Sequence, residues 1–341
     1  MSIRTSLRVG VLAVVAAMGW SPALAETVTL RVSTGFPAIH DTTTKLVMPW
    51  IEELSRRSGV KIEPTLFSAG SSLGGLDRQL DQVQGGVVDA AVGLAVVPRG
   101  RMPRTGLADL PFLGADSRQV NIGLSSLIDT DLAPDFKGIR LVNLFVDCSV
   151  LHTVNKPVRT LDDIRGLRIR VPSALGAALV DAVGGIPVAM PQSEIYENLQ
   201  RNVIDGAVTP WDVIQSLNLG EVLNYHTENV LFCGQLWFAF NEKSYQALPD
   251  AVRASFDEIN GEYALDLAQD TYAQARASAQ VFARKNGNEF TKLSDEDMTK
   301  WHGLVQPAVE KYLAETESAG VANIRAIYAS LQAAIAAAAG K

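Results

Sequence analysis

Two arginines in a short apolar run could bind an anion. Residues 167–172 read Leu-Arg-Ile-Arg-Val-Pro, and this period-two alternation predicts a strand with both arginines on one face. Arg170 ends that strand just before Ser173, which can begin a helix. A guanidinium binds a carboxylate through two parallel hydrogen bonds, and helix N-terminal amides add partial positive charge. Arg170 is therefore a candidate carboxylate ligand; an exposed arginine or an internal ion pair is the alternative.

A second motif could support hydrolysis. Residues 70–74 read Gly-Ser-Ser-Leu-Gly, which fits the G-x-S-x-G pattern of a nucleophile elbow with Ser72 as nucleophile. Asp205 and His226 follow Ser72 in the order that an α/β hydrolase requires. No glycine-rich oxyanion loop precedes the serine, so a serine hydrolase is only the runner-up. We expect a binding protein and not an enzyme.

Other kinds of chemistry have little support in the sequence. The histidines are isolated, there is no H-E-x-x-H motif, and no phosphate-binding loop is present, so we expect neither a metal nor a cofactor. The net charge of -7 is spread along the chain without a basic block. Nucleic acid is therefore not an expected partner. The four histidines are His40, His152, His226 and His302.

Strands and helices alternate along most of the chain. Alternation of this kind predicts an α/β fold, with mostly parallel sheets and helices on both faces. After residue 241 the pattern becomes helical. The strands expected from apolar runs are 28–32, 60–67, 87–92, 167–171 and 203–208, and the helices between them include 76–83, 173–184 and 193–202.

One segment occurs twice. Residues 80–93 and 196–209 share Gln, Val, Asp, Ala and Val at matching positions, so we expect two units of like architecture; a chance match of helix and strand segments is the alternative. Ligands of parallel sheets bind beyond the carboxyl ends of the strands. The repeat therefore singles out as candidate ligand contacts the residues that follow its two strands, Gly93, Leu94, Thr209 and Trp211.

Several runs resemble a known family. Residues 166–172 with Pro-Val-Ala-Met-Pro at 187–191, Val-Ile-Asp-Gly at 203–206 and Asp-Leu-Pro-Phe-Leu at 109–113 are similar to the solute-binding proteins of tripartite ATP-independent periplasmic (TRAP) transporters. The similarity covers nearly all of the chain after residue 25. It implies a two-lobed, type II-like periplasmic-binding-protein fold, two hinge strands and a long helix spanning both lobes.

The resemblance also implies a role for single residues. Arg170 matches the family's carboxylate-binding arginine. Three positions depart from the family pattern: Thr209 replaces an asparagine, Ser149 falls where a second basic residue is expected, and Leu94 stands where relatives of sugar-acid specificity place an acidic contact. The loss of these polar groups favours a less polar cargo than a dicarboxylate.

We therefore expect the ligand to be a small organic monocarboxylate with an apolar or aromatic body. Arg170 would hold its carboxylate and Thr209 would donate a hydrogen bond, with ordinary core packing as the alternative for the aromatic residues. By the resemblance, TRAP membrane permease subunits are the partners; service to a membrane sensor is left open. The residues expected to cover the ligand's body are Phe36, Trp211 and Trp237, with Gln192 a weaker candidate.

The chain ends and the cysteines complete the sequence predictions. Residues 1–25 have a basic start, an apolar run and a small-residue cleavage pattern, which predicts a signal peptide and a periplasmic protein. By the resemblance, lobe I takes 26–150 plus about 239–279, and lobe II takes 151–238 plus about 280–335.

Cys148 and Cys233 are interpreted as small buried apolar residues; the resemblance puts their strands side by side, so a disulfide is the alternative.

Overall fold

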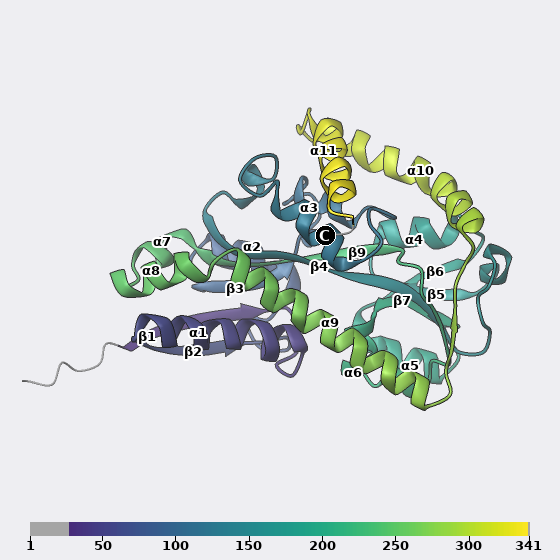
Figure 1. The fold of residues 1–341 in the computed structure, drawn as a ribbon, viewed down its shortest axis with the longest axis horizontal. Helices are drawn as coiled ribbons and strands as arrows, with labels where there is room; N and C mark the ends of the chain where they lie inside the picture. The colour runs from purple at the N-terminus through teal and green to yellow at the C-terminus, as the bar shows by residue number, and fades with distance from the viewer. Residues whose placement is uncertain (1–26, 340–341) are drawn as a thin grey trace, which may run out of the picture.

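The computed structural model describes residues 27–339, so the expected signal peptide at 1–25 lies outside the described residues. One mixed sheet runs through the molecule in the order β2-β1-β3-β9-β4-β7-β5-β6 (Figure 1). Its strands are β1 Thr27–Thr34, β2 Lys61–Phe67, β3 Ala90–Leu94, β4 Ile139–Thr153, β5 Arg168–Val171, β6 Ile186–Ala189, β7 Gly206–Pro210 and β9 Phe232–Asn241, with the short β8 Tyr225–Thr227 and β10 Glu289–Thr291 off this path.

Helices cover both faces of this sheet, as expected. Leucine, tryptophan and alanine side chains at helical spacing bury one stripe of α1, α8 and α9 against one face, and α2, α3, α10 and α11 pack on the other. The helices are α1 Met48–Ser58, α2 Gln79–Gln84, α3 Ser117–Ser125, α4 Ala174–Asp181, α5 Ile195–Gln200, α6 Trp211–Ser216, α7 Glu242–Gln246, α8 Asp250–Ile259, α9 Glu262–Lys285, α10 Asp295–Ser318 and α11 Ile324–Ala337.

The molecule has two lobes joined by two long strands. In each lobe the strands pair in parallel: β1 with β2 and β3, and β5 with β6 and β7. Between the lobes, β4 and β9 pair with each other in antiparallel register over most of their length. The helix α9 crosses from one lobe to the other in front of these strands (Figure 1). The predicted two-lobed fold with hinge strands and a spanning helix is confirmed.

The repeated segment forms the same structure in both lobes. In lobe I the Asp89 carboxylate accepts hydrogen bonds from the backbone N, Nε and Nη2 of Arg31 at 2.8, 3.0 and 2.8 Å. In lobe II the Asp205 carboxylate accepts from the same three groups of Arg168 at 2.8, 2.9 and 2.7 Å. Each aspartate thus fixes the register between the first and third strands of its lobe.

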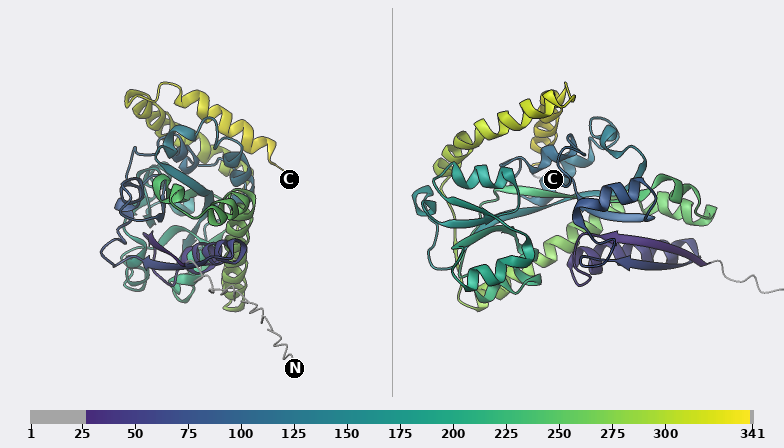
Figure 2. Two further views of the ribbon diagram at one scale, coloured as in Figure 1. Left: turned by 90° about the vertical axis from the view of Figure 1, so that its left-hand side faces the viewer. Right: turned by 180° about the vertical axis from the view of Figure 1, so that it is seen from behind.

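The C-terminal helices lie against both lobes (Figure 2). Near its start, α10 packs on α4, where the Trp301 indole donates to the carbonyl of Leu179 at 2.8 Å. Helix α11 then packs on α3, where the Gln119 amide donates to the carbonyl of Ile335 at 3.0 Å. Within residues 27–339 no helix combines the length and apolar character needed to cross a bilayer.

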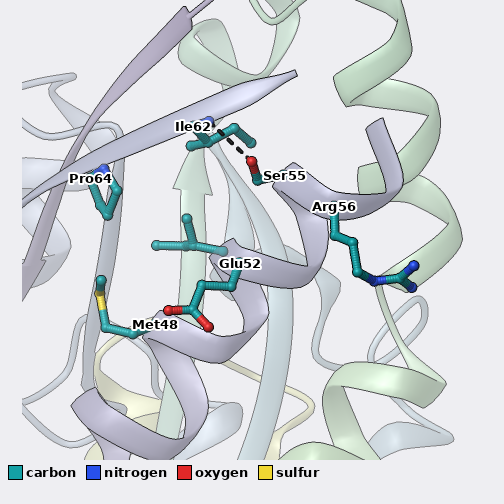
Figure 3. A pocket seen from close by; sticks show the side chains of 7 residues that line it. Met48, Glu52, Ser55, Arg56, Ile62 and Pro64 are labelled. Atoms are coloured by element: carbon teal, nitrogen blue, oxygen red, sulfur yellow. Dashed lines mark hydrogen bonds between the residues drawn. The ribbon is translucent and has the colours of Figure 1, made fainter. Parts of the chain in front are cut away.

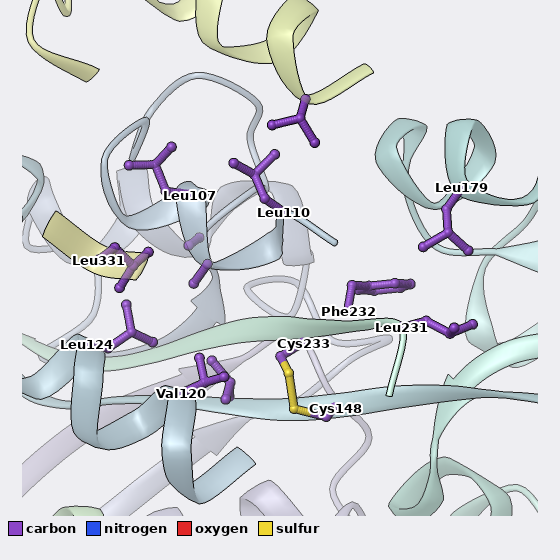
Figure 4. Packing of buried hydrophobic residues seen from close by; sticks show 14 of the residues in the cluster. Leu107, Leu110, Val120, Leu124, Cys148, Leu179, Leu231, Phe232, Cys233 and Leu331 are labelled. Carbon is purple, nitrogen blue, oxygen red and sulfur yellow. A yellow bond between two sulfur atoms is a disulfide. The ribbon is translucent and has the colours of Figure 1, made fainter. Parts of the chain in front are cut away.

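Cys148 and Cys233 form a disulfide between the two hinge strands (Figure 4). They are direct partners in the β4–β9 register, and their Cα atoms lie 3.9 Å apart, below the limit of about 7 Å. Both cysteines are buried, as predicted. The prediction that they are unbonded is wrong, and the alternative, a disulfide, is correct. The disulfide links positions 85 residues apart and pins the two hinge strands to each other.

Replacing both cysteines by alanine tests this contribution. We expect the double variant to lose about 2–5 kcal/mol of unfolding free energy, because the crosslink restricts the unfolded chain. Urea denaturation followed by circular dichroism measures the loss. Dithiothreitol should destabilise the wild type and leave the double variant unchanged; equal stability of the two proteins without reductant would contradict the assignment.

Candidate functional site

Arg170 is buried without a counter-charge. Its side chain is on β5, the residue is only 3% exposed, and Ile169 and Val171 point to the opposite face, into the apolar core. Nε donates to the carbonyl of Met190 at 3.2 Å and Nη1 to the carbonyl of Val208 at 3.3 Å. Among residues 27–339 it forms no ion pair. Burial lowers its pKa to about 10, so the guanidinium remains charged at neutral pH.

The strand and helix around Arg170 follow the sequence prediction. The Ser173 hydroxyl accepts a hydrogen bond from the backbone N of Gly176 at 3.2 Å and so caps α4. Arg168, two residues earlier on the same strand, has its charge matched by Asp205. Two arginines of one strand thus have opposite environments: one is paired and partly exposed, and the other is buried and unpaired.

Thr209 lies beside Arg170 on the same face of the sheet. Arg170 is in register with Ala207 on the parallel strand β7, and Thr209 follows two residues later. Its hydroxyl is fully buried and has no hydrogen-bond partner within the described part of the chain. An unpaired buried hydroxyl costs about 1–3 kcal/mol. A ligand oxygen that paired with this hydroxyl would remove that cost.

Four further candidates come from other segments of the chain. Ser149 of β4 is buried and in register with Pro210, whereas Thr209 is in register with Val150, so the Ser149 side chain lies on the opposite face of the sheet from Thr209. Gln192 begins a short helical turn two residues after Met190, whose carbonyl holds Arg170. On lobe I, Leu94 ends β3, and Phe36 follows β1.

Phe36 is connected to lobe II through the side chain of His40. Its ring stacks on His40 with the ring centroids 4.8 Å apart, and His40 contacts Asp212 on α6. Asp212 follows Thr209 by three residues. The structure therefore brings the apolar Phe36 of one lobe toward the polar strand ends of the other.

The two tryptophans and Gly93 have other roles. Trp211 is 3% exposed and stacks on Phe290 at 5.6 Å, with His152 and His226 against its other edges. Trp237 is fully buried in the core on the face opposite Leu94, and a Cβ on Gly93 would lie 2.5 Å from its ring. Their surroundings are those of core residues, so we leave all three out of the site.

The serine motif does not form a catalytic triad. Ser72 is exposed on a loop, and the Asp205 carboxylate is already held by Arg168. His226 is buried against His152, with their Nδ1 atoms 2.7 Å apart. Burial lowers the pKa of His226 to about 4, which suits a neutral core residue. The geometry does not support the hydrolase alternative.

Sequence reasoning missed a buried acidic cluster between the lobes. Asp147 of β4 and Asp212 of α6 lie side by side, and His40 of lobe I lies 3.5 Å from Asp212. No motif could have revealed this cluster, because its members come from three segments far apart in the sequence.

A surface pocket lies away from all of these residues (Figure 3). It opens between α1 and β2 on the outer side of lobe I, lined by Met48, Glu52, Pro64 and neighbouring residues. Two of its polar side chains already have partners: Ser55 donates to the carbonyl of Val60 at 2.8 Å, and Arg56 pairs with Glu53. The pocket lacks an arginine or lysine free to pair with an anion among the residues that line it.

One protein family matches most of the chain. The family described as bacterial extracellular solute-binding protein, family 7, matches residues 35–316. A 2,3-diketo-L-gulonate-binding periplasmic protein of Escherichia coli is 27% identical over 263 residues, which are 75% of this chain and 73% of that protein.

Two solved structures of TRAP solute-binding proteins have the same fold. One, from a marine metagenome and specific for aromatic acid ligands, holds 3-hydroxybenzoate; it is 24% identical, covers 92% of this chain and 99% of its own, and has a TM-score of 0.83. The other, from Rhodoferax ferrireducens, holds copurified benzoate; it is 25% identical, covers 91% of this chain and 98% of its own, and has a TM-score of 0.81.

Replacing Arg170 by methionine tests whether the buried charge lowers the unfolding free energy of the ligand-free protein. The burial that lowers its pKa from the ordinary value of an arginine to about 10 disfavours the charged form by about 3 kcal/mol. We expect Arg170→Met to raise the unfolding free energy of the ligand-free protein by roughly 1–3 kcal/mol. Arg168→Met is the matched control and should lower it, because Asp205 would lose its partner. A destabilised Arg170→Met protein would contradict this view.

Proposed function

This chain belongs to the bacterial extracellular solute-binding proteins of family 7, and on that basis we propose that it captures a small aromatic monocarboxylate for a TRAP transporter. The family is periplasmic, and its members bind small organic ligands and work with membrane permease subunits. We propose that residues 1–25 are a signal peptide and that this protein acts in the periplasm.

The unpaired charge of Arg170 carries the proposal. A guanidinium that is only 3% exposed has lost most of its hydration, and an anion that enters its surroundings restores a partner. The attraction strengthens as closure removes water, because Coulomb energy grows as the effective dielectric constant falls. A carboxylate fits best, since its two oxygens match the two parallel donors of a guanidinium.

The small number of polar groups around Arg170 favours an apolar body. Beside the arginine we assign Thr209 and Gln192 to the ligand, and Phe36 and Leu94 to its apolar part. Lobe I offers no second cation at the position equivalent to Arg170: Ser33 stands there, and its hydroxyl donates to the carbonyl of Leu73 at 2.7 Å. A sugar acid would leave many hydroxyl groups without partners in such a site.

Relatives with aromatic ligands support the same choice. Benzoate and 3-hydroxybenzoate occupy the two similar TRAP structures, and each has one carboxylate on one ring. We propose that this chain closes its lobes on a ligand of that kind. We place lobe I at 26–150 plus about 239–279 and lobe II at 151–238 plus about 280–335, with α11 resting on lobe I through α3.

Isothermal titration with benzoate, 3-hydroxybenzoate, succinate and malate tests the substrate class. We expect at least one aromatic monocarboxylate to bind, and Arg170→Ala to weaken it by roughly 30- to 1,000-fold, which corresponds to about 2–4 kcal/mol. Arg165→Ala is the matched control: Arg165 is exposed, and among residues 27–339 its ion pair is with Asp162, so this variant should bind the ligand with wild-type affinity.

Two results would count against the proposal. Binding of succinate or malate without binding of any aromatic acid would overturn the substrate class. Equal affinity of the wild type and of Arg170→Ala for the ligand that does bind would overturn the role of Arg170.

A further inference from the structure

Three side chains from separate segments meet where the lobes touch. His40 follows β1 in lobe I, Asp212 begins α6 in lobe II, and Asp147 lies on the hinge strand β4. They are 6%, 5% and 7% exposed. The His40 Nε2 lies 3.5 Å from Asp212 Oδ2, and the Asp147 carboxyl group is close enough to feel the charge of Asp212.

The groups around this cluster do not neutralise it. Helix α9 contributes Tyr272, whose hydroxyl lies 2.6 Å from that of Thr42, and Arg276, which donates to Ser117 at 2.8 Å and acts on Asp147 only through its charge. Asp41 is bonded to Lys45. His40 holds its other ring nitrogen, Nδ1, 3.1 Å from the Thr42 hydroxyl.

Two buried carboxyl groups in contact cannot both be ionised cheaply. Burial first, and the charge of Asp212 second, raise the pKa of Asp147 well above its ordinary value. One oxygen of each group, Oδ2 of Asp147 and Oδ1 of Asp212, is buried without a hydrogen-bond partner among the described residues. Either oxygen could therefore carry a proton without losing a hydrogen bond.

Separation of the lobes would remove this constraint. His40 and Asp212 belong to different lobes, so their contact exists only while the lobes are together. In an open conformation water would reach the cluster, and the pKa of Asp147 would fall toward the ordinary value of an aspartate, about 4. Closure therefore brings a carboxylate pair out of water and takes up a proton.

We propose that His40, Asp147 and Asp212 form a proton-dependent latch between the lobes, which makes closure and ligand capture more favourable as the pH falls. The Nδ1 atom of His40 accepts from the backbone N of Thr42 at 3.2 Å, so its Nε2–H faces Asp212 across the lobe boundary. A proton on Asp147 would remove the repulsion on the hinge side. The consequence for ligand affinity rests on the proposed function; the consequence for closure does not.

The sign of the pH dependence follows from the direction of the shift. The pKa of Asp147 is higher in the closed protein than in the open one. Its contribution to closure is therefore fully present below pH about 4 and is lost as the pH rises through the closed-state pKa. Within that window, uptake of one proton changes the closed-to-open ratio by up to about tenfold per pH unit.

Spin labels on the two lobes can measure this ratio without any ligand. Cysteines introduced for Glu52 on α1 and Glu197 on α5, both exposed, accept labels while Cys148 and Cys233 remain in their disulfide. Electron–electron distance distributions between pH 8 and pH 5 should show the short-distance population growing as the pH falls. Asp147→Asn, which keeps the shape but cannot ionise, should give a ratio that does not change over this range.

Two further variants complete the test. His40→Gln should reduce the short-distance population at pH 5, and Asp162→Asn, an exposed carboxyl, should keep the wild-type response. A wild-type ratio that is constant with pH, or a full pH response in Asp147→Asn, would overturn the latch. If the distances respond to pH but benzoate does not bind at pH 5 or pH 8, the latch stands and the substrate proposal fails.

Discussion

A buried guanidinium without a carboxylate partner is the constraint around which the rest of the structure is arranged. Arg170 is held by two backbone carbonyls, which fix its direction but do not cancel its charge. The strand β5, the capped helix α4 and the core behind Ile169 and Val171 keep it in place. A protein tolerates such a desolvated charge when an anion supplies the missing partner.

The two lobes share one framework and differ at the position where we propose that the ligand binds. The pairs Arg31–Asp89 and Arg168–Asp205 have matching hydrogen bonds in lobe I and lobe II. Two residues beyond each paired arginine the equivalence ends, because Ser33 stands in one lobe and Arg170 in the other. The matching frameworks therefore carry a serine in lobe I and a buried arginine in lobe II at equivalent positions, while the hinge strands and α9 connect the lobes.

Features set by local sequence could be predicted, and features set by distant contacts could not. The strand of Arg170 and the cap at Ser173 follow from neighbouring residues and were predicted correctly. The strand predicted at 87–92 begins later, at Ala90, because the amides of Val87 and Val88 donate to the carbonyl of Gln82 in a turn. The disulfide, the burial of both tryptophans in the core and the acidic cluster depend on segments that are far apart in the sequence.

A crystal structure of the protein with benzoate tests the central claim most directly. The account predicts both carboxylate oxygens within about 2.7–3.0 Å of the Arg170 guanidinium nitrogens, with the Thr209 hydroxyl on one of them and the ring against Phe36 and Leu94. A benzoate bound elsewhere, while Arg170 keeps only its two backbone carbonyls, would contradict it.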